Sequence, residues 1–139
     1  MHGGRYQAAG LRRVLREVRP EVFHAHFLVE HGFYGALAGF HPYVVTAWGS
    51  DVLVEPQRDV ISKLIAKWTL RRADLVTSNN AYMAERIVAL GAPRSKVEVV
   101  TLGADRYFLD RAGASVNVRP ADLARVPVVL STRAHEPLY

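Results

Sequence analysis

Residues 43–51 read Tyr43-Val44-Val45-Thr46-Ala47-Trp48-Gly49-Ser50-Asp51. The apolar and β-branched side chains at 43–47 are typical of a buried strand. The glycine and the two polar residues at 49–51 predict a turn that begins where the strand ends. This segment therefore indicates a buried strand with a polar turn at its carboxyl end.

The same pattern recurs before and after this segment. Further strands are predicted at 21–27, 74–78 and 96–102, and we interpret all four strands as buried rather than alternating in polarity. Helices are predicted at 8–18, 28–40, 61–68 and 81–90, with a loop from 48 to about 57. Strands that alternate with helices predict an α/β fold, a Rossmann-like doubly wound parallel sheet.

Local signals support the helices. Leu11, Val14, Leu15 and Val18, and then Ile61, Leu64, Ile65 and Trp68, recur at the spacing of an amphipathic helix. Asp59 or the loop before it, Asn79 or Asn80, and Gly91 are the predicted helix caps. The small residues Gly32, Gly35, Ala36, Ala38 and Gly39 predict a helix that packs closely on its neighbours.

Length and composition narrow the class of protein. The chain has 139 residues, of which 50% are hydrophobic and 22% charged, as expected for one globular domain. It has no cysteine, which excludes disulfides, thiolate zinc sites and a cysteine nucleophile. No apolar run is long enough to span a bilayer, and residues 1–5 do not lead into a signal peptide. We expect a cytoplasmic protein.

The charge is basic and unevenly distributed. Lys and Arg exceed Asp and Glu by 18 to 13, and the segments 5–19 and 58–74 carry five basic residues each. Such clusters attract nucleic acid, anionic lipid or a phosphorylated substrate, or they form a solvated helix face. The sequence has no zinc-finger, aromatic RNA-binding or basic-zipper pattern, so we expect no nucleic-acid partner. Peripheral membrane contact through Arg12, Arg13 and Arg16 is a hypothesis.

Ligands of open α/β sheets bind at the carboxyl ends of the strands, so the residues there are the candidate site. His26 shares a strand face with His24. The pair could be metal ligands, but no third ligand stands at a recognised spacing, and we predict no metal. The other readings are a histidine bonded to the backbone and a histidine that faces a ligand.

The segment Trp48-Gly49-Ser50-Asp51 is the strongest site candidate. Its glycine admits a close ligand, its serine and aspartate offer oxygen atoms, and its indole offers a flat face on which a sugar could stack. The alternative is a plain turn. A nucleophilic role for Ser50 is disfavoured because the second glycine of a nucleophile elbow is missing, and we assign no catalytic residue.

Other strand ends offer weaker candidates. Asn79 is either a ligand contact or part of a helix cap. Gly103 and Asp105 either form a turn, with Asp105 as a cap, or contact a ligand. The sequence has no Walker loop, no G-x-G-x-x-G and no H-E-x-x-H, which removes the commonest nucleotide and metalloprotease motifs.

Five collinear segments together resemble the amino-terminal, acceptor-side domain of a retaining family 4 glycosyltransferase of GT-B fold. They are 21–26, 43–51, 70–78, 87–91 and 96–105. The resemblance covers roughly residues 10 to 110. It implies a partial amino-terminal domain at 1–105, an interdomain linker at 106–126 and the start of a donor-binding domain at 127–139. Relative to the family, we expect a chain truncated at both ends.

The resemblance also implies site residues and a reaction. It places Gly49 and Asp51 near the sugar, with His26 on the acceptor side, although Trp48 stands where many members have histidine. Gly103 and Asp105 match the family residues at which the chain leaves the domain and enters the interdomain linker. Arg133 matches a family arginine that binds the donor phosphate. The implied reaction is metal-independent transfer from a nucleotide sugar to a sugar, lipid-linked or other hydroxyl acceptor, with retained configuration and no other cofactor.

Two other functions stay open. One is another GT-B enzyme, such as a sugar-nucleotide epimerase, which would act on a nucleotide sugar without an acceptor. The other is a non-catalytic module that binds an acceptor or a protein partner.

Overall fold

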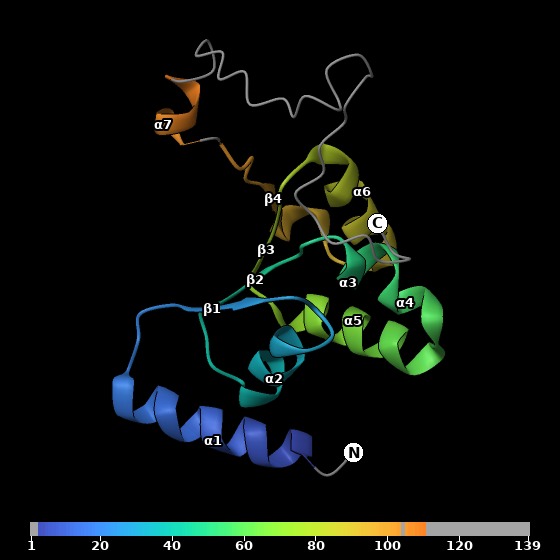
Figure 1. The fold of residues 1–139 in the computed structure, drawn as a ribbon. Coiled ribbons are helices and arrows are strands. Elements are labelled where there is room, and N and C mark those ends of the chain that lie inside the picture. Colours follow the sequence, from blue (N-terminus) through green and yellow to red (C-terminus); the bar gives the residue numbers. More distant parts are fainter. Residues whose placement is uncertain (1–2, 104, 111–139) are drawn as a thin grey trace, which may run out of the picture. The chain divides into compact units, whose positions relative to one another are not determined.

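The structure, a computed structural model, describes residues 3–103 and 105–110. The chain divides into two compact units, 1–102 and 103–139. The first unit contains a four-stranded sheet and its helices (Figure 1). The predicted boundaries at 105 and 126 stay predictions, and the predicted segment 127–139 lies outside the described residues.

The sheet is entirely parallel, with strands in the order β1 (Phe23–His26), β2 (Tyr43–Thr46), β3 (Leu75–Ser78) and β4 (Val97–Val99). One row of paired residues runs across all four strands and is buried: Ala25, Val45, Val76 and Val97. The α/β class and the parallel Rossmann-like sheet are therefore as predicted.

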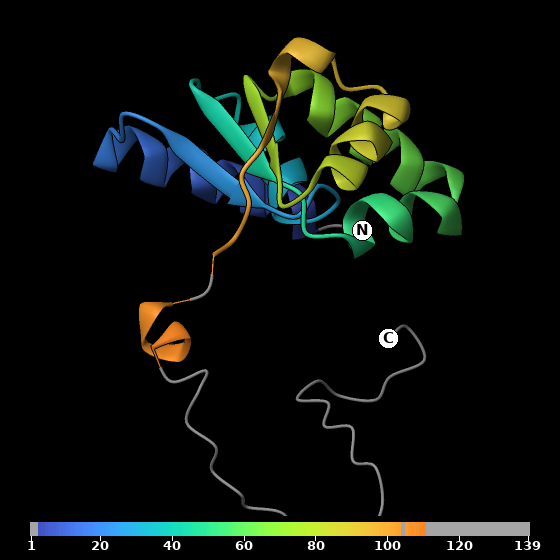
Figure 2. The same ribbon diagram turned by 90° about the horizontal axis from the view of Figure 1, so that it is seen from above.

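Helices connect the strands on one face of this sheet. α2 (His31–Ala38), α5 (Val60–Arg72) and α6 (Ala81–Leu90) lie on the same side in Figures 1 and 2. Right-handed crossovers between strands that are added in one direction place every connecting helix on that side. α1 (Gly3–Val18) packs against α2.

This arrangement corrects the interpretation that the strands are buried throughout. Successive side chains of β1, β2 and β3 alternate between a covered face and an open face. On β1, Ala25 is buried whereas His24 and His26 are exposed. No helix among the described residues of this unit covers the open face, so polar residues there remain accessible.

The predicted caps are confirmed. The Asn80 side chain accepts a hydrogen bond from the Met83 amide at 2.8 Å and begins α6, and Gly91 ends it with φ of +118°. Asp59 caps α5 through the Ser62 amide, also at 2.8 Å. The predicted loop from 48 to 57 is wrong, because two short helices stand there, α3 (Ser50–Leu53) and α4 (Glu55–Arg58).

The close packing predicted for the 28–40 helix is confirmed in α2. A Cβ atom at Gly32 would stand 2.5 Å from the Phe27 carbonyl oxygen, and one at Gly35 would stand 2.6 Å from the Phe23 ring. Tyr43 is buried beneath this helix and donates a hydrogen bond to the Gly32 carbonyl at 2.7 Å. Burial also raises the pKa of Tyr43.

The apolar stripe of α5 does not face the core. Of the four predicted stripe residues, Ile65 is half-buried, whereas Ile61, Leu64 and Trp68 are 58%, 60% and 37% exposed. An apolar stripe ordinarily marks the buried side of a helix. Ala66, Thr69 and Leu70 are buried instead. The small side chains of Ala66 and Thr69 on that side allow α5 to lie close to α2.

The second unit is described only at its start. α7 (Arg106–Leu109) occupies the beginning of the predicted linker. The Asp105 carboxylate accepts a hydrogen bond from the Tyr107 amide at 2.7 Å, so the predicted capping role of Asp105 is confirmed. Across residues 3–103 and 105–110, no helix is long and apolar enough to cross a membrane.

Candidate functional site

The carboxyl ends of the strands bring several predicted site residues together. His26, Trp48 and Asn79 line a cavity of about 360 Å³, whose other lining residues are both polar and apolar. They follow, or end, three neighbouring strands of the sheet. The parallel topology is what gathers them, because every strand of a parallel sheet ends at the same edge.

His26 and Trp48 are joined directly. The Trp48 Nε1–H donates a hydrogen bond to His26 Nδ1 at 3.1 Å, and the two ring centroids are 5.7 Å apart. Indole nitrogen is only a donor, so Nδ1 of His26 must be unprotonated while this bond exists. The neutral ring then carries its proton on Nε2, which makes His26 a hydrogen-bond donor at its other nitrogen.

The Trp48 ring remains available for contact. It is 45% exposed and also lies beside Phe27, with ring centroids 6.2 Å apart. An exposed aromatic face next to a hydrogen-bond donor is a combination that suits a sugar, which presents C–H groups on one side and hydroxyls at its rim.

Asp51 is buried within the turn after β2 and bonds to backbone amides. Its side chain is fully buried, and its carboxylate accepts three backbone hydrogen bonds, from Trp48 at 3.0 Å, Gly49 at 2.8 Å and Leu28 at 3.0 Å. These bonds join the turn after β2 to the turn after β1. The geometry favours a positioning role, and direct contact between Asp51 and a sugar stays a prediction.

Gly49 and Ser50 form the turn that Asp51 holds. Gly49 has φ of +131°, a conformation that residues with a Cβ rarely adopt, and its carbonyl accepts the first amide bonds of α3. Ser50 is the half-buried first residue of α3. Glycine at 49 is thus required by the backbone, in addition to any closeness to a ligand.

A second polar group lies beside His26 on the open face, and sequence analysis did not include it in the site. His24 Nε2 is 2.7 Å from the Thr46 hydroxyl, which is 2.6 Å from the Thr77 hydroxyl. The rings of His24 and His26 stand 4.5 Å apart. Burial lowers the pKa of His24, and the neighbouring His26 lowers it further. His24 and His26 alternate with Phe23 and Ala25 in the sequence, which was the signal for the histidines, whereas the two threonines carry no such signal.

The remaining candidates are distributed differently. Asn79 is half-buried and its side-chain oxygen accepts a bond from the Asn80 amide group at 2.8 Å. Thus Asn80 is the helix cap and Asn79 faces the cavity.

Gly103 and Asp105 belong to the second unit. Arg133 lies outside the described residues. Over the described ranges, no three His, Asp or Glu side chains are grouped as a metal site would need.

Comparison with known proteins identifies a family. A family model described as glycosyl transferase 4-like matches residues 3–80, which is more than half of the chain. The matched segment contains β1, β2 and β3 and therefore His26, Trp48, Asp51 and Asn79. A search of curated proteins found no significant match.

Proposed function

Because the chain belongs to the glycosyl transferase 4-like family, we propose that its sheet edge binds the acceptor of a retaining glycosyl transfer from a nucleotide sugar. The observation that carries this proposal is the His26–Trp48 pair. It combines an exposed aromatic face with an Nε2–H donor at the mouth of a cavity of about 360 Å³. That cavity is of a size suited to a small ligand such as a single sugar ring.

The residues divide into contacts and supports. Trp48 would stack on a sugar ring, and the Nε2–H of His26 would donate to one of its oxygens. Asn79 would add an amide at the rim of the cavity. Asp51 and Gly49 would act through the backbone, because they fix the turn from which Trp48 projects.

The reaction proposed is a transfer with retained configuration and without a metal. The acceptor hydroxyl oxygen forms a bond to the anomeric carbon on the face from which the nucleotide phosphate departs. The hydroxyl proton passes to the leaving phosphate, so the products are a glycoside and a nucleotide. Cations stabilise the charge that develops on the phosphate. The family resemblance assigns one such cation to Arg133.

We place this activity in the cytoplasm at a membrane surface, with Arg12, Arg13 and Arg16 of α1 facing anionic lipid. Arg12 also donates hydrogen bonds to the Leu37 and Ala38 carbonyls at the end of α2, and Arg13 pairs with Glu17 at 2.8 Å. Replacing the three arginines by glutamine should weaken vesicle binding. Unchanged binding would count against this contact.

The acceptor site is tested by titration of the 139-residue chain with simple alkyl glycosides, with binding monitored by saturation-transfer NMR. We expect weak binding that Trp48→Ala abolishes and His26→Ala reduces by about fivefold, the effect of one lost hydrogen bond. Trp68→Ala is the matched control, because Trp68 is on α5, away from the strand ends. Equal binding by the Trp48→Ala and Trp68→Ala variants would refute the site.

Assays with nucleotide sugars distinguish the reactions. Calorimetry of the chain against a panel of nucleotide sugars measures donor binding directly. Conversion of a nucleotide sugar in the absence of an acceptor would instead support an epimerase. A glycoside product of inverted configuration would contradict retention.

A further inference from the structure

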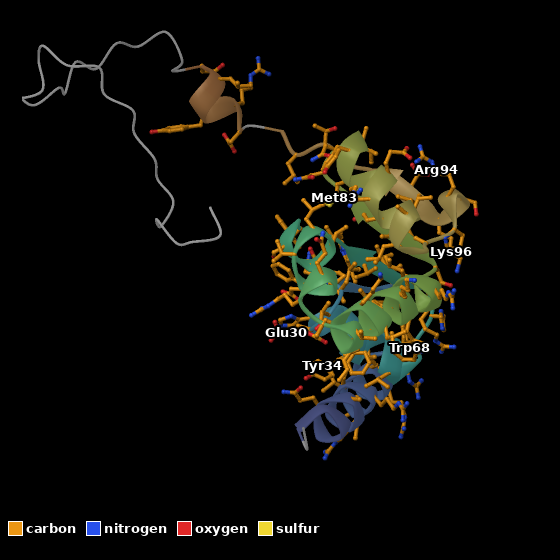
Figure 3. The ribbon with its side chains drawn as sticks, turned by 90° about the vertical axis from the view of Figure 1, so that its right-hand side faces the viewer. Glu30, Tyr34, Trp68, Met83, Arg94 and Lys96 are labelled. Atoms are coloured by element: carbon orange, nitrogen blue, oxygen red, sulfur yellow. The ribbon has the colours of Figure 1, made fainter. Side chains whose placement is uncertain are left out.

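The outer side of α5 presents an apolar stripe to solvent. Val60, Ile61, Leu64 and Trp68 are 73%, 58%, 60% and 37% exposed. Trp68 lies on the helix-bearing side of the molecule, as Figure 3 shows. Its ring meets that of Phe33 edge to face, with centroids 5.6 Å apart. The stripe therefore has a fixed aromatic group at one end and flexible aliphatic side chains along the rest.

The charged side chains of α5 itself are all cationic. α5 contains Lys63, Lys67, Arg71 and Arg72 and no acidic residue. By helical spacing, Lys63, Lys67 and Arg71 form one row along the stripe, and Arg72 stands on its other side. The acidic residue at the start of the helix, Asp59, accepts bonds from the Ser62 amide and hydroxyl, both at 2.8 Å.

We propose that α5 docks the protein on the surface of an anionic bilayer, with its axis in the plane of the membrane. Aliphatic and tryptophan side chains on one face of a helix, flanked by lysine and arginine, are the arrangement that binds at the boundary between headgroups and acyl chains. The long basic side chains reach the phosphates while the apolar stripe enters the bilayer. Thirteen residues are too few to span it.

Charge complementarity is what favours a lipid surface as the occupant. An apolar stripe alone would suit a protein partner equally well, but a row of three cations on one side and Arg72 on the other match a continuous layer of phosphate. α1 offers less for insertion. Its exposed apolar residues are Val14 and Val18, with no aromatic group beside them among its described side chains, 7–18. Its arginines can add attraction at a distance, whereas α5 supplies the inserted side chains.

The first experiment uses tryptophan fluorescence, since the chain has two tryptophans, Trp48 and Trp68. In the Trp48→Phe variant, only Trp68 emits. Vesicles of phosphatidylcholine with phosphatidylglycerol should shift this emission to shorter wavelength, and brominated acyl chains should quench it. The Trp68→Phe variant, in which only Trp48 emits, should show no quenching. Quenching of Trp48 alone, or of neither residue, would overturn the proposal.

The second experiment measures sedimentation with the same vesicles for matched variants. Ile61→Gln with Leu64→Gln should weaken binding tenfold or more. Val14→Gln with Val18→Gln on α1 is the control and should change it little. Replacing Lys63, Lys67 and Arg71 by glutamine should weaken binding by about fivefold per charge, and pure phosphatidylcholine should bind poorly. A loss of binding confined to the α1 variant would contradict docking by α5.

Folding and self-association are checked on the same samples. All the substituted side chains are exposed or half-buried, so circular dichroism and melting should match the parent chain. Concentration-dependent dimerisation that the α5 variant abolishes, with no vesicle binding by the parent, would identify a second copy as the occupant and refute the proposal. No nucleotide sugar or acceptor is added, so failure here leaves the proposed glycosyl transfer untouched.

Discussion

Trp48 Nε1 donates a hydrogen bond to Nδ1 of His26, across a distance of 3.1 Å. This bond fixes the tautomer of a histidine at the end of one strand through a side chain that follows the next strand. The imidazole then points its only N–H, at Nε2, away from the indole. A donor in a defined direction is what an oriented contact with a sugar oxygen requires.

The tautomer can be tested without any ligand. In nitrogen-15 NMR spectra at neutral pH, His26 should show an unprotonated Nδ1 and a protonated Nε2. Trp48→Phe removes the donor but keeps an aromatic ring, so the His26 ring should then populate both neutral tautomers. Trp68→Phe should leave the His26 signals unchanged. A protonated Nδ1 in the parent protein would show that the bond is absent in solution.

Asp51 makes a second testable connection, because one buried carboxylate serves three backbone amides. Asp51→Ala leaves those amides without their acceptor, and we expect it to lower the free energy of unfolding by about 3 kcal/mol or more. Asp51→Asn keeps one oxygen and should cost less. Urea denaturation measures both.

The matched control for Asp51 is Asp59→Ala. Asp59 also accepts a bond from a backbone amide, but it caps an exposed helix end, so its loss should lower the free energy of unfolding much less than the loss of Asp51 does. If both alanine variants cost the same, Asp51 is an ordinary turn residue. In that case Asp51 does not hold Trp48 in place.

Glycine substitutions should have opposite effects at two positions. Gly49→Ala forces a Cβ into a backbone with φ of +131° and should destabilise the chain by about 1–3 kcal/mol. Gly10 lies within α1 and a Cβ there would meet nothing within 4 Å. Gly10→Ala should therefore stabilise by about 0.5–1 kcal/mol. Melting curves measure both effects. Destabilisation by both substitutions, or by neither, would contradict the expected difference between the two positions.

Much of this fold could be predicted from local pattern. The run at 43–47 is apolar and β-branched, and Asn80 and Gly91 bracket a helix whose bounds match the prediction. The order of strands and helices then restricts the topology, because parallel strands need helical crossovers. Signals of this kind depend on residues near one another in the chain, so they can be recognised without knowledge of tertiary contacts.

The open face of the sheet could not be predicted in the same way. The threonines of β2 and β3 look like ordinary strand residues until the register places Thr46 opposite His26 and Thr77 opposite Thr46. Likewise, the stripe on α5 has the spacing of a buried face, and only the packing of Ala66 and Leu70 shows that the helix is turned the other way. Periodicity identifies an apolar face but does not say what covers it.

The buried aspartate illustrates the same limit at the site. Next to Gly49, an aspartate could bind a ligand or hold a turn, and both functions use the same residue types. The distinction came from the Leu28 amide, which is 23 positions away in the chain and 3.0 Å away in space.

The last prediction concerns pH and the group formed by His24, Thr46 and Thr77. Burial lowers the pKa of His24 below its ordinary value of 6.5, with a further contribution from His26. In the pH range just below 6.5 the unfolded chain therefore binds more protons at this residue than the folded chain does. The linkage relation then requires stability to fall as the pH decreases through that range.

The comparison that isolates this effect is between the parent chain and His24→Gln, melted at a series of pH values between neutral and mildly acidic. Glutamine keeps a polar group near the Thr46 hydroxyl but does not titrate, so its melting temperature should decline less steeply on acidification. Toward neutral pH, the difference between the two melting temperatures should become constant. Parallel curves would show that His24 titrates identically in the folded and unfolded states, and that the open face of the sheet is more hydrated than the contacts of His24 imply.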